Sequence, residues 1–490
     1  MKQLLVLVPV FFAATLFAQQ RATGMIFDAP SLRSIPYKAK LTSESYGNMP
    51  SSASLEKYCP TPGDQGAYGT CVAFATAYHL RTILHNKLTS EATGDDITKI
   101  NRNSSIFSPT YVYEQIKDKS DRDCQDGSNP VDAFDLLKKS GAALLSVQPY
   151  ACGTSVKQEA ITQASKFRIV DYQILYMPGE EDQKLIINST KKAISEGYPC
   201  MLGFIVAESF YGVKGDVWRE QSTDKGPTGQ HGRHAMCVVG YDDNKYGGAF
   251  RVMNSWGTAW ADKGFVWIPY KDFAKYAIIG IQAYGPSNPK PDPVKPDIIP
   301  TQLKGSIRFE LNTGEAMISS RVLTRNLEIA DNDEAFKEEL VAYKMEQAYT
   351  SGTRFRFNIT TNTEAYIYAF ATDLSGKVNK LLPFADNMSP HVGGNSTVAF
   401  PSENKVIKMD ENPGTDYLLI LYSQEKLDAA DLLRKMNEMK GGLTRKIKSA
   451  LGDKLTLPSD ITYHLKSIGF DVKQGHKGTV VPVMVELTHR

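Results

Sequence analysis

The segment Asp64–Leu80 (DQGAYGTCVAFATAYHL) places Cys71 between a glycine-bearing turn and an apolar run that is typical of a buried helix. A cysteine is a useful nucleophile at neutral pH only when its thiolate is stabilised. The first turn of a helix does this through unpaired N–H groups and the positive end of the helix dipole. On composition alone, an inert buried cysteine is the simpler interpretation. A catalytic role for Cys71 therefore depends on partner groups elsewhere in the chain.

Four further residues carry groups that would serve a catalytic thiol. His234 begins the apolar run HAMCVVGY, where an imidazole can face a thiolate and form an ion pair with it. Asn254, in RVMNSWG, would orient the imidazole, and Trp256 would shield that hydrogen bond from water. Gln65 would donate to the oxyanion of a tetrahedral intermediate, together with the Cys71 backbone N–H. These residue types predict acyl transfer to a thiol.

These segments resemble the papain family of cysteine peptidases, in which Gln, Cys, His and Asn follow one another in this chain order. The resemblance rests on Q-x5-C-x-A-F around Cys71, on HAMCVVGYD and on NSWG, and it covers about residues 58–284. It implies an α+β, two-lobed fold, in which a helical left lobe presents Cys71 and a β-barrel-like right lobe presents His234 and Asn254. It also implies hydrolysis of peptide bonds through a Cys71 thioester, with His234 as acid and base and with no cofactor.

The segment before the nucleophile departs from the family pattern. Where the family commonly has Cys-Gly-Ser-Cys-Trp, this chain has Tyr68-Gly69-Thr70-Cys71-Val72, so the usual disulfide beside the nucleophile cannot form. The chain thus lacks the family's first cysteine, at Tyr68, and its tryptophan, at Val72. Neither change affects the groups that transfer protons. A peptide ligase, an amidase and a catalytically silent peptide-binding protein on the same scaffold stay open as alternatives. The presence of both nucleophile and base disfavours the silent protein.

The resemblance also indicates substrate-binding positions and a disulfide. Gly127 matches a glycine whose backbone lines the family's cleft, where extended substrates pair through main-chain hydrogen bonds. Asp126 replaces a second glycine there, and it either favours basic substrate side chains, narrows the cleft or is a solvated turn residue. Trp256 completes the expected substrate-binding set. Because Cys124 and Cys152 fall near cystine positions of the left lobe, we expect a bridge between them.

The sequence predicts neither a metal site nor a nucleic-acid partner. His231, His234 and Cys237 form a His-x-x-His-x-x-Cys string, but in a strand these side chains do not converge and no fourth ligand is near in sequence. Lys and Arg number 56 against 54 Asp and Glu, a balance that excludes binding to nucleic acids or anionic membranes by bulk charge. The expected partner is a protein or peptide substrate.

Composition divides the chain into five expected parts. Lys2, the apolar run up to Phe17 and Ala18 follow the plan of a signal peptide, and no later segment is long enough to span a membrane. Six prolines after Tyr284 mark a semi-rigid linker. The expected parts are a signal peptide (1–18), a leader segment (19–50), a papain-like domain (51–284), a linker (285–302) and a β-rich domain (303–490).

The last of these parts alternates apolar and polar residues, which predicts a sandwich-like β domain. Helical segments are expected near residues 335–349 and 427–439. This part resembles an uncharacterised module appended to exported bacterial enzymes, and its own partner is unknown. Together with the signal peptide, it predicts a secreted, periplasmic or cell-envelope protein of the bacterial exported type.

Precursors of the family usually carry a long, helical inhibitory segment before the catalytic domain. Residues 19–50 show no amphipathic helix that could serve in this way. Activity is therefore restrained differently, or not at all. One hypothesis is that residues 19–50 or the C-terminal domain occlude the cleft.

Overall fold

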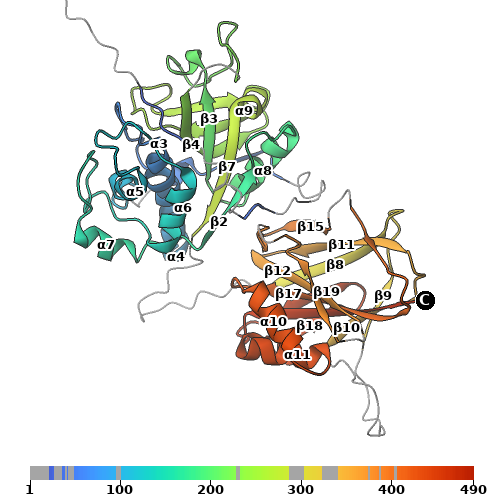
Figure 1. The fold of residues 1–490 in the computed structure, drawn as a ribbon. Helices are drawn as coiled ribbons and strands as arrows, with labels where there is room; N and C mark the ends of the chain where they lie inside the picture. The colour runs from blue at the N-terminus through green and yellow to red at the C-terminus, as the bar shows by residue number, and fades with distance from the viewer. Residues whose placement is uncertain are drawn as a thin grey trace, which may run out of the picture.

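The computed structural model describes residues 21–26, 36–38, 41, 49–94, 101–227, 232–285, 303–322, 340–373, 376–385, 388–401 and 405–490. The predicted signal peptide, nearly all of the expected linker and His231 lie outside these residues. The described chain forms two bodies, named here the N-terminal domain (residues 49–285) and the C-terminal domain (residues 303–490) (Figure 1). Within the described residues, no helix combines the length and the apolar character needed to cross a membrane.

The helical half of the N-terminal domain is built around one continuous helical stretch that begins at Cys71. It consists of α3 (Cys71–Ala73), the π-helix η2 (Phe74–Arg81) and α4 (Thr82–Thr93). Every side chain from Cys71 to Leu84 is buried, as the apolar sequence predicts. Helices α5 (Pro109–Ile116) and α6 (Pro130–Lys139) pack against this stretch, and α7 (Gln158–Ala164) follows them. Both α5 and α6 begin at a proline behind a side-chain cap, from Ser108 and Asn129 respectively.

The other half is a seven-stranded antiparallel sheet in the order β2-β7-β3-β4-β5-β6, with β1 on β4. Its strands are β1 (Ser52–Ser54), β2 (Asp171–Tyr176), β3 (Cys200–Val206), β4 (Gly232–Asp242), β5 (Ala249–Met253), β6 (Phe265–Pro269) and β7 (Ala277–Tyr284). Helices α8 (Gln183–Ser195) and α9 (Tyr270–Tyr276) pack on it, and η1 (Glu56–Tyr58) and η4 (Glu208–Phe210) are short turns. Met253 pairs with Cys237. This register brings Asn254, the next residue, close to His234 near the start of β4.

The C-terminal domain consists of two packed sheets. One has the order β13-β12-β17-β20-β10-β9 with β14 on β12, and the other has the order β15-β11-β8-β19-β18 with β16 on β11. The strands are β8 (Lys304–Leu311), β9 (Ser319–Arg321), β10 (Val341–Met345), β11 (Arg354–Thr361), β12 (Ala365–Thr372), β13 (Val378–Leu382), β14 (His391–Val392), β15 (Ser396–Phe400), β16 (Ile407–Lys408), β17 (Gly414–Ser423), β18 (Ile461–Tyr463), β19 (Ile468–Val472) and β20 (Val480–His489).

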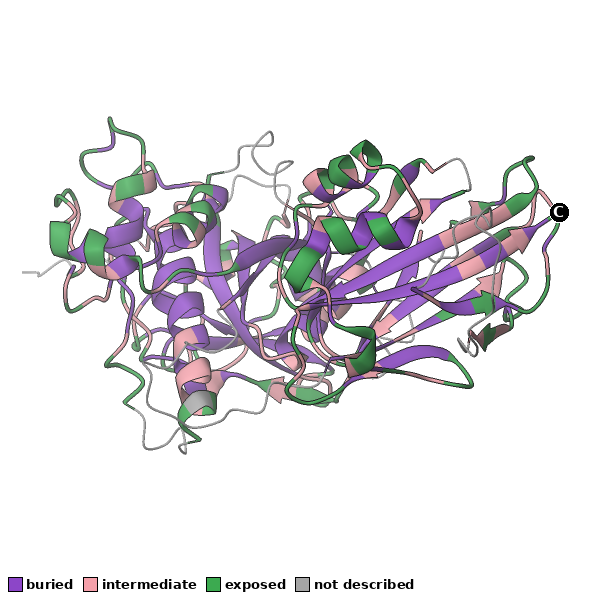
Figure 2. Cartoon of the chain, turned by 90° about the horizontal axis from the view of Figure 1, so that it is seen from below, coloured by how far each residue is buried: buried purple, intermediate pink, exposed green. Residues whose placement is uncertain are grey.

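Apolar side chains of both sheets meet in one core, called here the inter-sheet core, as a sandwich requires. Helices α10 (Ala429–Glu438) and α11 (Leu443–Leu451) cover the opposite face of the sheet that contains β12 and β17. The turns η5 (Gly452–Lys454) and η6 (Pro458–Asp460) follow them. Figure 2 shows the buried residues concentrated along the strands and the central helix.

The expected fold class, α+β and papain-like with a β-rich, sandwich-like C-terminal domain, is confirmed. The helix near residues 427–439 is present as α10. The helix expected near residues 335–349 is wrong for its described part, residues 340–349, and residues 335–339 lie outside the described residues. Val341–Met345 forms β10, because this segment pairs with β20 on one side and β9 on the other. Sheet pairing outweighs the helix-favouring composition of the segment.

Candidate active site

Cys71 is the first residue of α3, and its side chain is fully buried. Burial raises the pKa of the thiol to about 11, while backbone N–H groups of Ala235, Gly24, Val72 and Cys71 itself act in the opposite direction. Ala235 follows His234 directly, so the strand that carries the predicted base reaches the thiol. The N–H groups of Cys71 and Val72 are the donors that the start of a helix offers to a thiolate, and those of Ala235 and Gly24 come from other segments.

The His234 imidazole is held by Asn254 and Trp256. His234 Nε2 lies 2.7 Å from Asn254 Oδ1, and because an amide oxygen only accepts, Nε2 carries the proton. Nδ1 has no hydrogen-bond partner among the described residues. The Trp256 ring stacks on the imidazole with the ring centroids 4.8 Å apart. Burial lowers the pKa of His234 to about 4, and the bond to Asn254 opposes this. The imidazole is thus neutral at pH 7, with Nδ1 available to accept a proton.

Gln65 is fully buried beside this pair, and its amide is fixed from both ends. The Oε1 atom accepts a hydrogen bond of 2.6 Å from Ser255 Oγ, which determines which way the amide points. The Nε2 atom donates to Tyr68 O at 2.7 Å and to Ala22 O at 3.3 Å. A backbone carbonyl of the chain therefore occupies the place where Gln65 would meet a substrate carbonyl.

Ala22 belongs to an N-terminal stretch that we call the strap, defined as the described residues 21–26, 36–38 and 41. Residues 21–26 form its cleft piece. Ser128 N–H donates to Gly24 O at 2.9 Å, and Ile26 N–H donates to Ser128 O at 3.0 Å. On the opposite side, Met25 N–H donates to Arg233 O at 3.1 Å. The cleft piece thus pairs through its main chain with the helical half and with the sheet half at once.

Side chains of the cleft piece contact the same region. Met25 is 5% exposed and lies against Gly203 of β3, where an added Cβ would be 2.8 Å from Met25 Cε. Arg21 lies over the Trp256 ring at 5.5 Å and donates a hydrogen bond to Tyr211 O. The cleft piece therefore covers the nucleophile, the base and the aromatic shield.

The predicted substrate-binding wall, formed by Gly127 and Asp126, lies beside the cleft piece, and its role in substrate binding stays a prediction. Gly127 N–H donates to Tyr113 Oη at 3.1 Å, so the main-chain pairing falls to the next residue, Ser128. Gly127 has φ +81°, and an added Cβ would lie 2.2 Å from Gly24 O. A glycine is needed there for close approach. Asp126 is exposed beside this wall.

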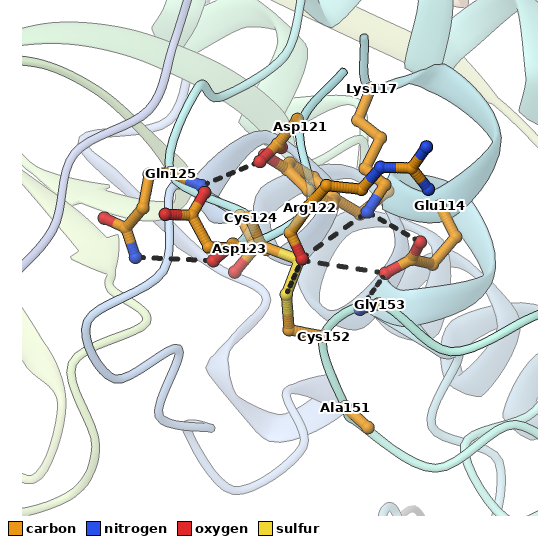
Figure 3. Close-up of a disulfide and its surroundings, with 12 residues drawn as sticks. Glu114, Lys117, Asp121, Arg122, Asp123, Cys124, Gln125, Ala151, Cys152 and Gly153 are labelled. Atoms are coloured by element: carbon orange, nitrogen blue, oxygen red, sulfur yellow. Dashed lines mark hydrogen bonds and ion pairs between the residues drawn. A yellow bond between two sulfur atoms is a disulfide. The ribbon is translucent and has the colours of Figure 1, made fainter. Parts of the chain in front are cut away.

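A disulfide joins Cys124 to Cys152 (Figure 3). Cys124 O accepts a hydrogen bond of 2.7 Å from Gly69 N–H, which ties the disulfide to the turn before the nucleophile. Glu114 lies beside it and is paired with Lys117 at 2.8 Å. Glu114 and the two sulfur atoms form the one metal-like cluster of the described residues, but disulfide sulfurs are not the thiolates that a metal requires. The other free cysteines, Cys59, Cys200 and Cys237, are buried.

Sequence reasoning missed three residues of the site, namely Ser128, whose backbone pairs with the cleft piece, Ser255 and His79. Ser255 orients Gln65, and its only signal was its place within NSWG. His79 is buried near His234, and burial, followed by repulsion from His234, lowers its pKa to about 3. Neither nitrogen of His79 has a hydrogen-bond partner among the described residues. A second imidazole kept neutral adds no competing positive charge beside the predicted base.

Together, the fold and the site define the class of this domain. Residues 53–284 match the family described as papain family cysteine protease, so the N-terminal domain carries the model of that family. Residues 348–426 match a domain of unknown function, DUF4384.

Known relatives resemble the N-terminal domain. The chain is 26% identical over 217 residues to an uncharacterized peptidase C1-like protein of Acanthamoeba polyphaga mimivirus, covering 42% of this chain and 64% of that protein. It is 25% identical over 209 residues to cysteine proteinase 2 of Entamoeba histolytica, covering 41% of this chain and 58% of that protein. The matched region thus spans less than two thirds of either relative. Among solved structures, xylellain, a cysteine protease from Xylella fastidiosa, is 20% identical, with a TM-score of 0.43 over 55% of this chain and 97% of that chain.

Proposed function

We propose that the protein is an exported cysteine peptidase that hydrolyses peptide bonds through Cys71. One observation carries the proposal. The cleft already holds an extended peptide backbone, whose Ala22 carbonyl accepts from Gln65 and whose Gly24 and Ile26 pair with Ser128. A cleft that binds backbone groups beside a thiol and an imidazole has the parts for acyl transfer from a peptide.

Each of the four site residues has a defined task once a substrate replaces the cleft piece. The Cys71 sulfur attacks the carbonyl carbon, and Gln65 Nε2 and the Cys71 N–H donate to the resulting oxyanion. His234 Nδ1 takes the thiol proton and passes it to the leaving amine as the C–N bond breaks. Water then attacks the thioester, His234 takes its proton, and the proton returns to the sulfur as the acid product leaves. Asn254 keeps the imidazole in the required tautomer.

The described conformation is a resting state of this apparatus. Burial raises the pKa of Cys71 to about 11 and lowers that of His234 to about 4, so both groups are neutral at pH 7. Opening the cleft admits water and removes much of this burial, which favours the thiolate–imidazolium pair. The proposal therefore includes restraint by the cleft piece, and export rests on the signal-peptide plan of residues 1–18.

The test uses a variant that opens the cleft. An added Cβ at Gly24 would lie 2.1 Å from Gly69 O, so Gly24→Val should expel the cleft piece. The exposed Ile26 gives a matched control in Ile26→Ala. We expect an epoxysuccinyl peptide to label Cys71 in Gly24→Val at least about 100-fold faster than in the unaltered chain or the control.

Labelling should be confined to Cys71 and should be lost in Gly24→Val combined with Cys71→Ala. The same Gly24→Val chain should hydrolyse a peptide pool, and product analysis with an added amine separates hydrolysis from ligation. If hydrogen exchange at Ser128 shows that the cleft is open while labelling and hydrolysis are both absent, the protein is a silent peptide-binding scaffold.

A further inference from the structure

We propose that the C-terminal domain binds residues 36–38 and Leu41 of its own chain, and that it thereby anchors the segment that covers the cleft. Residues 36–38 and 41 are called the anchor piece of the strap. The effect on activity rests on the proposed peptidase function, whereas the binding itself does not.

The main chain of the anchor piece is hydrogen-bonded to both domains. Lys38 N–H donates to Ile174 O at 2.8 Å, and Ile174 N–H donates to Pro36 O at 3.0 Å, which adds the anchor piece to β2. On the side that faces the C-terminal domain, Ser389 N–H donates to Tyr37 O at 2.9 Å. Residues 36–38 therefore connect the two domains through isolated β-bridges at Tyr37.

Leu41 lies within the C-terminal domain itself. It pairs antiparallel with Val398 of β15, and its side chain is 5% exposed within the inter-sheet core. Both strands that receive the anchor piece, β2 and β15, end the strand orders of their sheets. Edge strands offer unpaired main-chain groups, which are the usual binding sites for an added peptide strand.

The Lys38 side chain adds a buried ionic contact at the same junction. Lys38 Nζ lies 3.2 Å from Glu196 Oε2 and 3.2 Å from Gln282 Oε1, and the Lys38 and Glu196 side chains are 6% and 7% exposed. Glu196 also accepts from Ser396 Oγ of β15 at 3.0 Å. One buried carboxylate thus links the anchor piece, α8 and the C-terminal domain, and a buried charge left without partners is strongly unfavourable.

The two domains are also in contact beside the strap. Lys426 Nζ lies 2.6 Å from Asp171 Oδ2, and the rings of Tyr284 and His391 are 3.8 Å apart between centroids. The anchor site is therefore fixed relative to the cleft, and nine residues of sequence, 27–35, join the two described pieces. A segment tethered this closely has a high effective concentration at its binding site. Losing the anchor should open the cleft part of the time.

The experiment uses the full chain with Leu41→Asp, which places a charge in the inter-sheet core. Leu465→Asp, at a leucine that is 71% exposed in the same domain, is the matched control. Hydrogen exchange at Ser128 N–H, the partner of Gly24 O, reports whether the cleft is covered. We expect exchange at Ser128 and labelling of Cys71 both to rise about tenfold or more in Leu41→Asp, and neither to rise in the control.

A second variant changes the receiving side. Ser389→Pro removes the N–H that donates to Tyr37 O, together with the hydroxyl that accepts from His391 N–H at 3.2 Å, and it should raise both signals in the same direction by a smaller factor. A thermal unfolding scan confirms that each variant is folded. Unchanged protection at Ser128 in both folded variants would overturn the anchoring role. Because hydrogen exchange needs no catalysis, a failure of the anchor is distinguishable from a failure of Cys71 chemistry.

Discussion

The two pieces of the strap are held in different ways. In the cleft, residues 21–26 are held mainly by main-chain hydrogen bonds, and Gly24 passes where no side chain fits. At the anchor, buried side chains contribute as well, with Lys38 paired to Glu196 and Leu41 inserted into the inter-sheet core. The cleft therefore holds its piece of the strap mainly by the backbone, whereas the anchor site recognises particular side chains.

The largest expected effect comes from removing the Gln65 amide, which donates a hydrogen bond to the Ala22 carbonyl. Gln65→Ala, built on the Gly24→Val chain, should lower kcat for peptide hydrolysis by about 100- to 1000-fold, because one oxyanion donor is lost. Steady-state kinetics on a fluorogenic peptide measures this change. Ser255→Ala keeps the Gln65 amide but frees its orientation, so its loss should be smaller, and KM should change little. Equal losses in the two variants would show that Gln65 acts through packing and not through its amide.

An intermediate effect is expected at the anchor. Lys38→Met keeps the length of the side chain but leaves Glu196 with Lys192, at 3.5 Å, as its remaining nearby cation. Breaking a buried ion pair costs about 3 kcal/mol, so Cys71 labelling in the full chain should rise by roughly 100-fold. Lys57→Met, at an exposed lysine of the N-terminal domain, is the control. A rate unchanged from that control would mean that the backbone pairing alone holds the anchor piece.

The smallest effect is a dependence on pH at the contact between the domains. Burial by itself raises the pKa of Asp171, but Lys426 and Lys138 outweigh it, and the net pKa lies below the ordinary 3.8. A lowered pKa means that the carboxylate contributes stability above that ordinary value and loses it as the pH falls through the folded value. The melting temperature should fall by roughly 2–4 °C more between pH 6 and pH 3 in the unaltered chain than in Lys426→Met. A parallel fall in both chains would place the acid sensitivity elsewhere.

Sequence predicted those site residues whose spacing along the chain and whose side-chain chemistry indicate the same role. Gln65 and Cys71 lie in one segment and His234 in another, far along the chain, yet turn, helix and strand signals place each of them. Ser128 was missed because it acts through its backbone, which leaves no trace in side-chain type. Occlusion of the cleft by residues 19–50 or by the C-terminal domain was a hypothesis from sequence, but no local pattern indicated that residues 21–26 are the ones in the cleft, since a chain held by its main chain needs no recognisable period.

The C-terminal domain was less predictable. Alternating residues such as those around Phe357 indicated strands, but not which strands pair. Val341–Met345 lies in a charged run whose composition favours a helix, and its strand state depends on β20, far along the chain. Contacts at such separation are invisible to a local pattern. For the same reason, no pattern indicated that Leu41 completes a core built by residues after 303.

Gly24, Gly69 and Gly127 come from different segments and lie in close contact beside Cys71. Their close packing limits which other chains can bind along the path of the strap. An added Cβ at Gly24 would lie 2.1 Å from Gly69 O, and one at Gly127 would lie 2.2 Å from Gly24 O. A foreign protein threading along the path of the strap would need a glycine at this one step. Most protein segments lack a glycine at the matching position, so other proteins would bind poorly in place of the strap. The resting state is therefore specific to the protein's own strap. Abundant non-substrate proteins in the surroundings would not inhibit an opened enzyme by binding in the same way.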